Sequence, residues 1–385
     1  MDKIKVMTVF GTRPEAIKMA PLVKVLEKRA EFDSIVCVTA QHRQMLDQVL
    51  DFFNIKADYD LDIMKSGQTL SDITARVMKG IEETIKVAKP DIVLVHGDTT
   101  TTFAGALASF YCQTKIGHVE AGLRTYDKYS PFPEEMNRCL TTNLADLYFA
   151  PTNNNRDNLL KENVDEEKIF ITGNTVIDAI SHTVNDSYVF ENEVLRNIDF
   201  ENKRVILVTA HRRENLGEPM KNIFRAILNT VNSSDDIEVV YPVHLNPLVR
   251  DLAHEILGGH ERIHLIEPLD VTELHNLMSR CFFVMTDSGG LQEEAPSLGK
   301  PVLVLRNETE RPEAVYAGTV KIAGVNEEEI TKMAKELLFD KNEYEKMSKA
   351  VNPYGDGLAS ERIADAILYA FGRKTQKPEN FGMKN

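Results

Sequence analysis

The stretch Asp-Ile-Val-Leu-Val-His-Gly-Asp-Thr-Thr-Thr-Thr, residues 91–102, decides the fold class. It opens with an apolar run between Pro90 and Gly97, as expected of a β-strand that is buried on both faces. The small residues 101–110 follow directly and predict a helix. A buried strand that leads straight into a helix is typical of a parallel α/β sheet.

The same alternation of strand and helix extends along the chain in both directions. Helices are predicted at 14–29, 70–88 and 360–371, and strands at 3–10, 34–40, 115–119, 147–150 and 169–173. Residues 178–203 are polar and lack a clear strand. A second series then starts at Arg204, with strands at 238–242, 263–265, 282–286 and 301–305. We therefore predict an α/β protein of two Rossmann-like, doubly wound domains that face each other across a cleft, residues 1–173 and 174–357.

Composition narrows the class of protein. The 385 residues are too many for one ordinary core, which agrees with two domains. The net charge of −14 argues against nucleic acid as a partner, because phosphate backbones need basic surface. No apolar run approaches the roughly 20 residues that span a bilayer. The four cysteines lie far apart without a CxxC pair, so neither a zinc site nor a disulfide scaffold is indicated, and a cytoplasmic location is expected. The polar tail from Lys374 is expected to be frayed.

Three carboxylates follow predicted strands in the first half, namely Asp98, Glu120 and Glu134. The carboxyl ends of parallel strands form the rim where ligands bind, and carboxylates in differing environments can serve as base and acid. Asp98 could instead be a helix N-cap, and Glu134, after Pro133, could simply complement a helix dipole. Glu120 does not stand in a typical capping sequence.

Cationic and glycine-containing segments complement these acids. Gly11 joins the first strand to the first helix, where free N–H groups, Arg13 and Lys18 could receive an anion, although a plain turn is the alternative. Ser288, Gly289 and Gly290 open a helix in a way that suits a diphosphate, and the alternative there is an ordinary Ser/Asp cap. Further candidates in the second half are His211, Arg212, His244, Glu294 and Arg311.

At these residues the chain resembles the bacterial non-hydrolysing UDP-N-acetylglucosamine 2-epimerases. The similar motifs run in order from about residue 3 to about residue 371: Phe-Gly-Thr-Arg-Pro-Glu-Ala-Ile-Lys, Gln-His-Arg-Gln-Met-Leu-Asp, His-Gly-Asp-Thr-Thr-Thr-Thr, His-Val-Glu-Ala-Gly-Leu-Arg-Thr, Pro-Glu-Glu-Met-Asn-Arg, Thr-Ala-His-Arg-Arg-Glu-Asn and Thr-Asp-Ser-Gly-Gly-Leu-Gln-Glu-Glu-Ala-Pro.

The resemblance implies a glycosyltransferase-B architecture, with UDP bound mainly by the second domain and a final helix, residues 358–372, packing back on the first. It implies interconversion of UDP-GlcNAc and UDP-ManNAc without metal or NAD, by anti-elimination of UDP, a 2-acetamidoglucal intermediate and re-addition. It also implies a homodimer that supplies ManNAc for teichoic acid or other surface polysaccharides.

The resemblance also implies roles for residues. The catalytic set would be Asp98, Glu120, Glu134, His211 and Lys18, with the base and the acid among the carboxylates undecided. The diphosphate, ribose and uracil contacts would be Arg13, Lys18, Ser288, Gly289, Gly290, Glu294, Arg311 and the loop from Leu269 to Leu274. Some family members carry a second, regulatory UDP-GlcNAc site, which here would comprise Gln41, Gln44, Gln68, Glu134, Arg212 and His244. Gly67 stands where related sequences often have arginine, so activation by substrate is a hypothesis.

Three other functions are possible interpretations of the same sequence. A retaining glycosyltransferase would share the fold and the nucleotide site but has little use for three carboxylates in the first domain. A hydrolysing epimerase would release free ManNAc, and the chain lacks the kinase domain often fused to that class. A catalytically inactive nucleotide-sugar sensor would be expected to lose the acids, which are all present.

Overall fold

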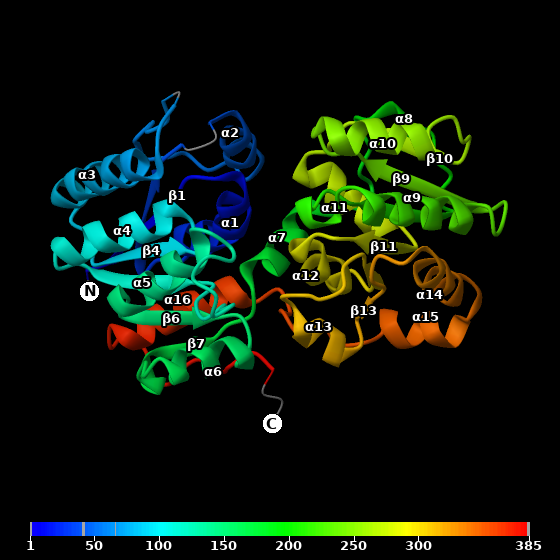
Figure 1. Ribbon diagram of the computed structural model, residues 1–385. Coiled ribbons are helices and arrows are strands. Elements are labelled where there is room, and N and C mark those ends of the chain that lie inside the picture. The colour runs from blue at the N-terminus through cyan, green and yellow to red at the C-terminus, as the bar shows by residue number, and fades with distance from the viewer. Residues whose placement is uncertain (1, 41–42, 66, 383–385) are drawn as a thin grey trace. The chain divides into compact units, whose positions relative to one another are not determined.

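The computed structural model describes residues 2–40, 43–65 and 67–382. The chain forms two compact units. Unit 1 contains residues up to Ala179 together with Tyr354 onward, and unit 2 runs from Ile180 to Pro353. Each unit has one parallel sheet with helices packed against it (Figure 1). The predicted α/β class with two Rossmann-like units is confirmed.

The sheet of unit 1 has seven strands in the order β3-β2-β1-β4-β5-β6-β7. Residues 91–102 contain β4 and the start of the next helix, as predicted. Thr8 on the central strand lies opposite Val36 on one side and Leu94 on the other. The strands are β1 (Ile4–Phe10), β2 (Phe32–Val38), β3 (Tyr59–Asp60), β4 (Ile92–His96), β5 (Lys115–Val119), β6 (Leu147–Ala150) and β7 (Ile169–Ile171).

Helices cover both faces of this sheet. On one face α1 packs with α16, where Leu22, Leu26, Ile363 and Ile367 are fully buried. On the other face α3 and α4 build a second buried cluster. The helices of unit 1 are α1 (Arg13–Lys28), α2 (Arg43–Phe52), α3 (Leu70–Ala88), α4 (Thr100–Tyr111), α5 (Glu134–Leu144), α6 (Asn153–Lys161), the short η1 (Glu166–Lys168), α7 (Thr175–Thr183), which continues into unit 2, and α16 (Ala359–Ala370).

Unit 2 repeats the design with six strands in the order β10-β9-β8-β11-β12-β13. These are β8 (Arg204–Thr209), β9 (Ile237–Pro242), β10 (Ile263–Ile266), β11 (Phe283–Thr286), β12 (Val302–Val304) and β13 (Val320–Ile322). The helical elements are α8 (Glu193–Asn197), η2 (Arg213–Asn215), α9 (Glu218–Val231), α10 (Pro247–Leu257), α11 (Val271–Arg280), α12 (Gly289–Ser297), α13 (Pro312–Ala317), α14 (Glu327–Phe339) and α15 (Lys341–Ser348).

The strand order fixes where a ligand belongs. In each sheet the order reverses beside the first strand, between β1 and β4 in unit 1 and between β8 and β11 in unit 2. Loops that leave the carboxyl ends of such strands diverge to opposite faces, and the gap between them is the usual ligand site of doubly wound sheets. The segments around Gly11, Asp98, His211 and Ser288 all follow these strands.

The C-terminal tail is ordered against the edge of unit 1, so the expectation that it is frayed is wrong for residues 374–382. The backbone N–H of Phe381 donates to Ile171 O at 2.8 Å, and Asn380 Oδ1 accepts from Ile171 N at 3.1 Å. Lys377 Nζ lies 5.1 Å from the centre of the Phe170 ring. The tail thus occupies hydrogen-bonding groups that the edge strand β7 would otherwise expose.

Candidate active site

The loop between β1 and α1 is organised by Glu15, which sequence reasoning missed. Thr12 caps α1, and the buried Glu15 Oε2 accepts from the backbone N–H groups of Gly11 at 3.0 Å and Thr12 at 2.8 Å. Its Oε1 accepts from Thr99 Oγ1 at 2.7 Å, which ties the loop to the start of α4. These two backbone N–H groups are therefore already bonded and are not available to an anion. The pattern Thr-x-x-Glu at residues 12–15 is a capping box and was the available signal.

Glu120 lies at the end of β5 with a φ of 62°, a left-handed conformation that is uncommon for a residue other than glycine. Its Oε2 lies 2.5 Å from Lys18 Nζ and 3.4 Å from His96 Nε2. Asn174 Nδ2 donates to the same oxygen at 3.1 Å. Burial would raise the pKa of Glu120, but Lys18 and then His96 outweigh it and hold the pKa well below its usual range. Glu120 is thus a largely buried carboxylate, with 13% of its side chain exposed, that stays ionised.

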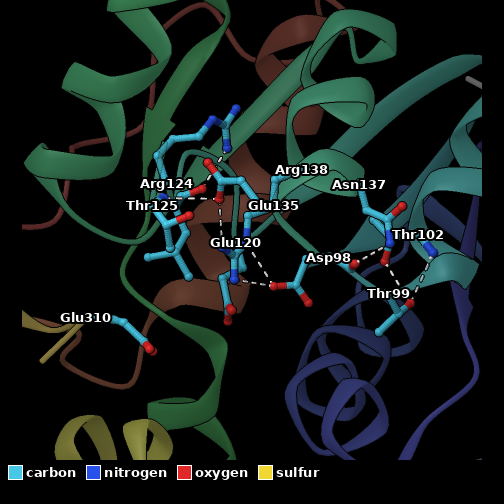
Figure 2. Close-up of polar contacts among 12 residues, drawn as sticks. Asp98, Thr99, Thr102, Glu120, Arg124, Thr125, Glu135, Asn137, Arg138 and Glu310 are labelled. Atoms are coloured by element: carbon cyan, nitrogen blue, oxygen red, sulfur yellow. Dashed lines mark hydrogen bonds and ion pairs between the residues drawn. The ribbon is translucent and has the colours of Figure 1, made fainter. Parts of the chain in front are cut away.

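Asp98 is paired with an arginine and is not a helix cap. The cap of α4 is Thr99, whose Oγ1 accepts from Thr102 N at 3.2 Å, so the capping alternative for Asp98 is wrong. Asp98 Oδ2 accepts from Arg138 Nε at 2.9 Å and from Arg138 Nη2 at 2.5 Å. Figure 2 shows this pair beside Asn137, whose side-chain amide donates to the Asp98 carbonyl at 2.9 Å. Two residues of α5 thereby fix the loop after β4.

Glu134 and Glu135 differ although they are neighbours at the start of α5. Glu135 is buried and accepts from the N–H groups of Thr125 at 3.1 Å and Tyr126 at 2.9 Å, and from Arg138 Nη1 at 3.0 Å. Burial raises the pKa of Glu135, but these bonds outweigh it and lower the pKa. Glu134 Oε2, in contrast, is buried without a hydrogen-bond partner among the described residues. Glu135 supports the loop structurally, and Glu134 is the carboxylate left for other chemistry.

Unit 2 centres on Asp287, a fully buried residue directly after β11. Its Oδ2 accepts from the backbone N–H groups of His211 and Arg212, both at 2.8 Å, and from Asn215 Nδ2 at 3.2 Å. The other oxygen, Oδ1, lies 3.3 Å from His211 Nδ1. Because the carboxylate is used in this way, Asp287 is a fixed support for the loop after β8, and the idea that it caps α12 is wrong.

His211 is held on several sides. Its ring stacks on that of His244, with centroids 5.2 Å apart and planes inclined by 10°. Burial lowers the pKa of His211, the charge of Asp287 opposes this, and His244 and Arg212 lower the pKa further. The net result is a histidine that is mostly neutral near pH 7, with Nδ1 directed at Asp287.

The start of α12 has the features of an anion site. Ser288 is the N-cap residue, but its side chain makes no capping hydrogen bond. A Cβ at Gly289 would lie 4.0 Å from Nη2 of both Arg212 and Arg311, so two guanidinium groups flank the helix terminus. Arg311 is itself ion-paired with Glu293. A helix N-terminus between two arginines suits a diphosphate, because the helix dipole and both charges are favourable.

The remaining predicted contacts are distributed as follows. Glu294 on α12 pairs with His275 Nε2 at 3.2 Å. Leu269 and Leu274 flank the start of α11. Gln68 is used within its own loop, since Oε1 accepts from Lys65 N at 2.5 Å and Nε2 donates to Ile63 O at 3.0 Å. Gln41 and the side chain of Gln44 lie outside the described residues. The regulatory site therefore stays a prediction, as do the roles of Arg13 and of the other candidates.

The described residues hold neither a cluster of metal ligands nor a membrane-spanning helix. Among residues 2–40, 43–65 and 67–382, no group of three or more His, Cys, Asp or Glu side chains is arranged to hold a metal ion. No helix in the described part of the chain has the length and apolar character needed to cross a membrane.

Comparison with known proteins gives a consistent result. A family model described as UDP-N-acetylglucosamine 2-epimerase matches residues 24–368. The UDP-N-acetylglucosamine 2-epimerase of Bacillus subtilis is 61% identical over 381 residues, which is 99% of each chain.

Solved structures agree. The structure of UDP-GlcNAc 2-epimerase from Neisseria meningitidis bound to UDP-GlcNAc has 50% identity and a TM-score of 0.86, covering 95% of this chain and all of that one. The S. aureus MnaA–UDP co-structure has 57% identity and a TM-score of 0.88, covering 98% of this chain and all of that one. Taken together, the fold, the two sets of site residues and these full-length similarities show that the chain belongs to the UDP-N-acetylglucosamine 2-epimerase family.

Proposed function

We propose that this protein interconverts UDP-GlcNAc and UDP-ManNAc by inverting C2 of the sugar. The observation that carries the proposal is Glu120, a largely buried carboxylate kept ionised by Lys18 and His96 in a chain of this family. An ionised, desolvated carboxylate is a competent proton acceptor, and a nucleotide-binding module without catalysis has no need of one. The relatives named as UDP-N-acetylglucosamine 2-epimerases cover 99% and 95% of the chain and support the same conclusion.

The reaction is an elimination followed by an addition. The C1–O bond to the diphosphate breaks, the C2 proton passes to a carboxylate on the opposite side, and a C1=C2 double bond forms, which gives UDP and 2-acetamidoglucal. UDP then adds back at C1 while a proton returns to the other face of C2. Because the proton on C2 is weakly acidic, departure of the diphosphate has to lead the step. Electrostatic stabilisation of that leaving group therefore matters most.

The two units divide this work. In unit 2 the N-terminus of α12, flanked by Arg212 and Arg311, receives the diphosphate, and His211, when protonated, can donate a hydrogen bond to it. In unit 1 Glu120, Asp98 and Glu134 are the candidates for removing and returning the proton. Glu120 suits the ionised role, and Glu134 Oε2, which has no described hydrogen-bond partner, is the carboxylate oxygen left to meet the substrate. Lys18 keeps Glu120 ionised in the ground state and stabilises its charge again after each turnover.

The other expectations belong to the same proposal. We expect a homodimer, a cytoplasmic location and use of the ManNAc unit in a surface polysaccharide. A regulatory UDP-GlcNAc site would use Arg212 and His244 in unit 2. Linear Michaelis kinetics with UDP-ManNAc, in the absence of added UDP-GlcNAc, would count against that regulatory site.

The test is proton NMR of the purified protein with UDP-GlcNAc in deuterated water, without added metal or NAD. We expect signals of UDP-ManNAc to grow in, with deuterium entering at C2. Release of free ManNAc and UDP would identify a hydrolysing enzyme. Binding of UDP without any turnover would redirect the search to sugar acceptors and a transferase.

Variants then test the division of roles. Glu120→Gln and Asp98→Asn remove a charge in unit 1, so both should abolish turnover while the affinity for UDP, measured by calorimetry, changes less than about threefold. Retained turnover in both variants would refute the assignment.

A further inference from the structure

Asn174 connects the ionised Glu120 with the place where the chain passes between its two units. The chain leaves unit 1 after Ala179 and returns at Tyr354. Asn174 is 3% exposed, and its backbone N–H donates to Tyr354 O at 2.6 Å. Its side-chain Nδ2 donates to Glu120 Oε2 at 3.1 Å. One residue therefore contacts both the carboxylate and the returning segment.

The side-chain amide of Asn174 has only one orientation that satisfies both neighbours. Oδ1 accepts from Val176 N at 3.1 Å, which requires an oxygen at that position. Glu120 is an acceptor, which requires the NH₂ group on the other side. Since the carbonyl and the amino group are each assigned by a neighbour, the donor to Glu120 is held in place by the local turn at the start of α7.

Asn174 differs from the other groups that face Glu120. Lys18 approaches from α1 and His96 from β4, while the neutral His118 lies behind on β5 and bonds to Gly97 O at 2.8 Å. Lys18 is a flexible cation with three donor hydrogens, so it keeps Glu120 ionised but does not restrict the orientation of the carboxylate group. Asn174 is neutral, short and buried, and thus fixes the angle. The contacts of Lys18, His96 and Asn174 all converge on Oε2, which directs Oε1 away from them.

We propose that Asn174 is a positioning residue for Glu120, which it orients so that Oε1 is the oxygen that exchanges a proton with the substrate. This inference rests on the proposed function, because it assumes that Glu120 takes part in proton transfer. A displacement of the segment at Tyr354 would also move Asn174, because the two residues share a backbone hydrogen bond, and would thereby change the angle of the Glu120 carboxylate.

The sharpest test is Asn174→Asp, which keeps the shape of the side chain. The Oδ1 bond to Val176 N and the backbone bond to Tyr354 O are both retained, so a purely structural role is preserved. Only the donor to Glu120 is replaced, by a second carboxylate oxygen. Two carboxylates in contact cannot both stay ionised easily, so the acid limb of the pH profile of kcat/KM should move to higher pH by about one unit or more. The affinity for UDP should equal that of the wild type.

Asn185→Asp is the matched control. Asn185 is exposed and its Oδ1 accepts from Ser187 N at 2.9 Å, the same bond to the second residue ahead that Asn174 makes. The control introduces the same charge change in the same kind of turn, away from Glu120, and should leave the pH profile where it is.

Asn174→Ser provides a second measurement, which decides the question if the aspartate variant fails to fold. Its Oγ can accept from Val176 N but is too short to reach Glu120, so kcat should fall by about tenfold with KM nearly unchanged. A wild-type pH profile in Asn174→Asp, or a wild-type kcat in Asn174→Ser, would overturn the inference. An inactive wild-type protein would instead refute the proposed function, so the two failures are distinguishable.

Discussion

Replacing Lys18 with methionine tests the largely buried ion pair between Lys18 and Glu120 in unit 1. The ammonium group lies 2.5 Å from Glu120 Oε2, and the two side chains are only 18% and 13% exposed. Removing one partner of a buried ion pair typically costs about 3–5 kcal/mol, because the remaining charge is left without compensation. Since both side chains keep some solvent contact, and His96 and Asn174 still face Glu120, we expect Lys18→Met to lower the free energy of unfolding by about 2–4 kcal/mol.

The sign of the pH dependence follows from the pKa of Glu120. In the wild type this pKa lies well below the usual value of 4.5, so the pair stabilises the protein above that value and its contribution is lost as the pH falls through the folded-state pKa. Lys18→Met removes the largest cause that lowers this pKa, while burial, which raises it, remains, so we expect the pKa of Glu120 to rise above its unfolded value. The variant should therefore be most destabilised near neutral pH, and part of the loss should be recovered as the pH falls and Glu120 takes up a proton.

Urea unfolding of four proteins measures this directly: the wild type, Lys18→Met, Glu120→Gln and the double variant. The coupling energy of this cycle should be about 2 kcal/mol or more at neutral pH and should shrink at about pH 5. Additive single effects, or a coupling energy that does not change with pH, would refute the reasoning that an ion pair holds Glu120 ionised.

Three further outcomes are expected. Burial lowers the pKa of His118 from 6.5 to about 4, so between these pH values the unfolded chain binds a proton that the folded protein does not bind. The stability advantage of the wild type over His118→Gln in urea unfolding should therefore shrink by roughly 3 kcal/mol as the pH falls from 7 to 4. A constant difference would contradict this. Asp287→Asn replaces one of the two carboxylate oxygens that hold the loop of His211 by an NH₂ group, which cannot accept a hydrogen bond. The affinity for UDP, measured by calorimetry, should therefore fall by about tenfold or more, and an unchanged affinity would show that Asp287 does not support the site. Gly122→Ala puts a Cβ 2.2 Å from Asn155 O at a φ of +92° and should lower the free energy of unfolding by more than about 3 kcal/mol. Gly217→Ala, at a φ of +89° with open space around it, should lower it by only about 1 kcal/mol. Equal losses in thermal or urea unfolding would show that the clash at residue 122 is relieved.

The fold was predictable because buried parallel strands have a strong local signal. The first four residues of β4 are all apolar, so neither the strand nor its place inside the sheet was ambiguous. The two-residue β3 at Tyr59–Asp60 was missed, because so short an edge strand has no periodicity of its own and forms only by pairing with β2. The ordered tail was also missed, since its order depends on a bond to Ile171, which lies more than 200 residues earlier.

The candidate site was predictable in its residue types more than in its contacts. The position of Asp98 after a strand was recognisable, yet its partner Arg138 is 40 residues away and no local pattern joins them. The pairing of Lys18 with Glu120 spans 102 residues and is likewise a product of the fold. Glu15 differs, because its capping box with Thr12 is a local signal that the sequence carried openly.

The two crossings of the chain make unit 2 an insertion into unit 1, and this has a consequence for synthesis on the ribosome. The strands of unit 1 are complete once Ile171 has emerged, but the face of the sheet that α1 covers also needs α16, which begins only at Ala359. Unit 2 lies entirely between these points and can close its own core first. In Figure 1 the red α16 lies among the blue and teal elements made at the start of translation. The apolar surface beside α1 therefore stays exposed throughout the synthesis of unit 2. During this period the nascent chain most needs a chaperone to cover that surface.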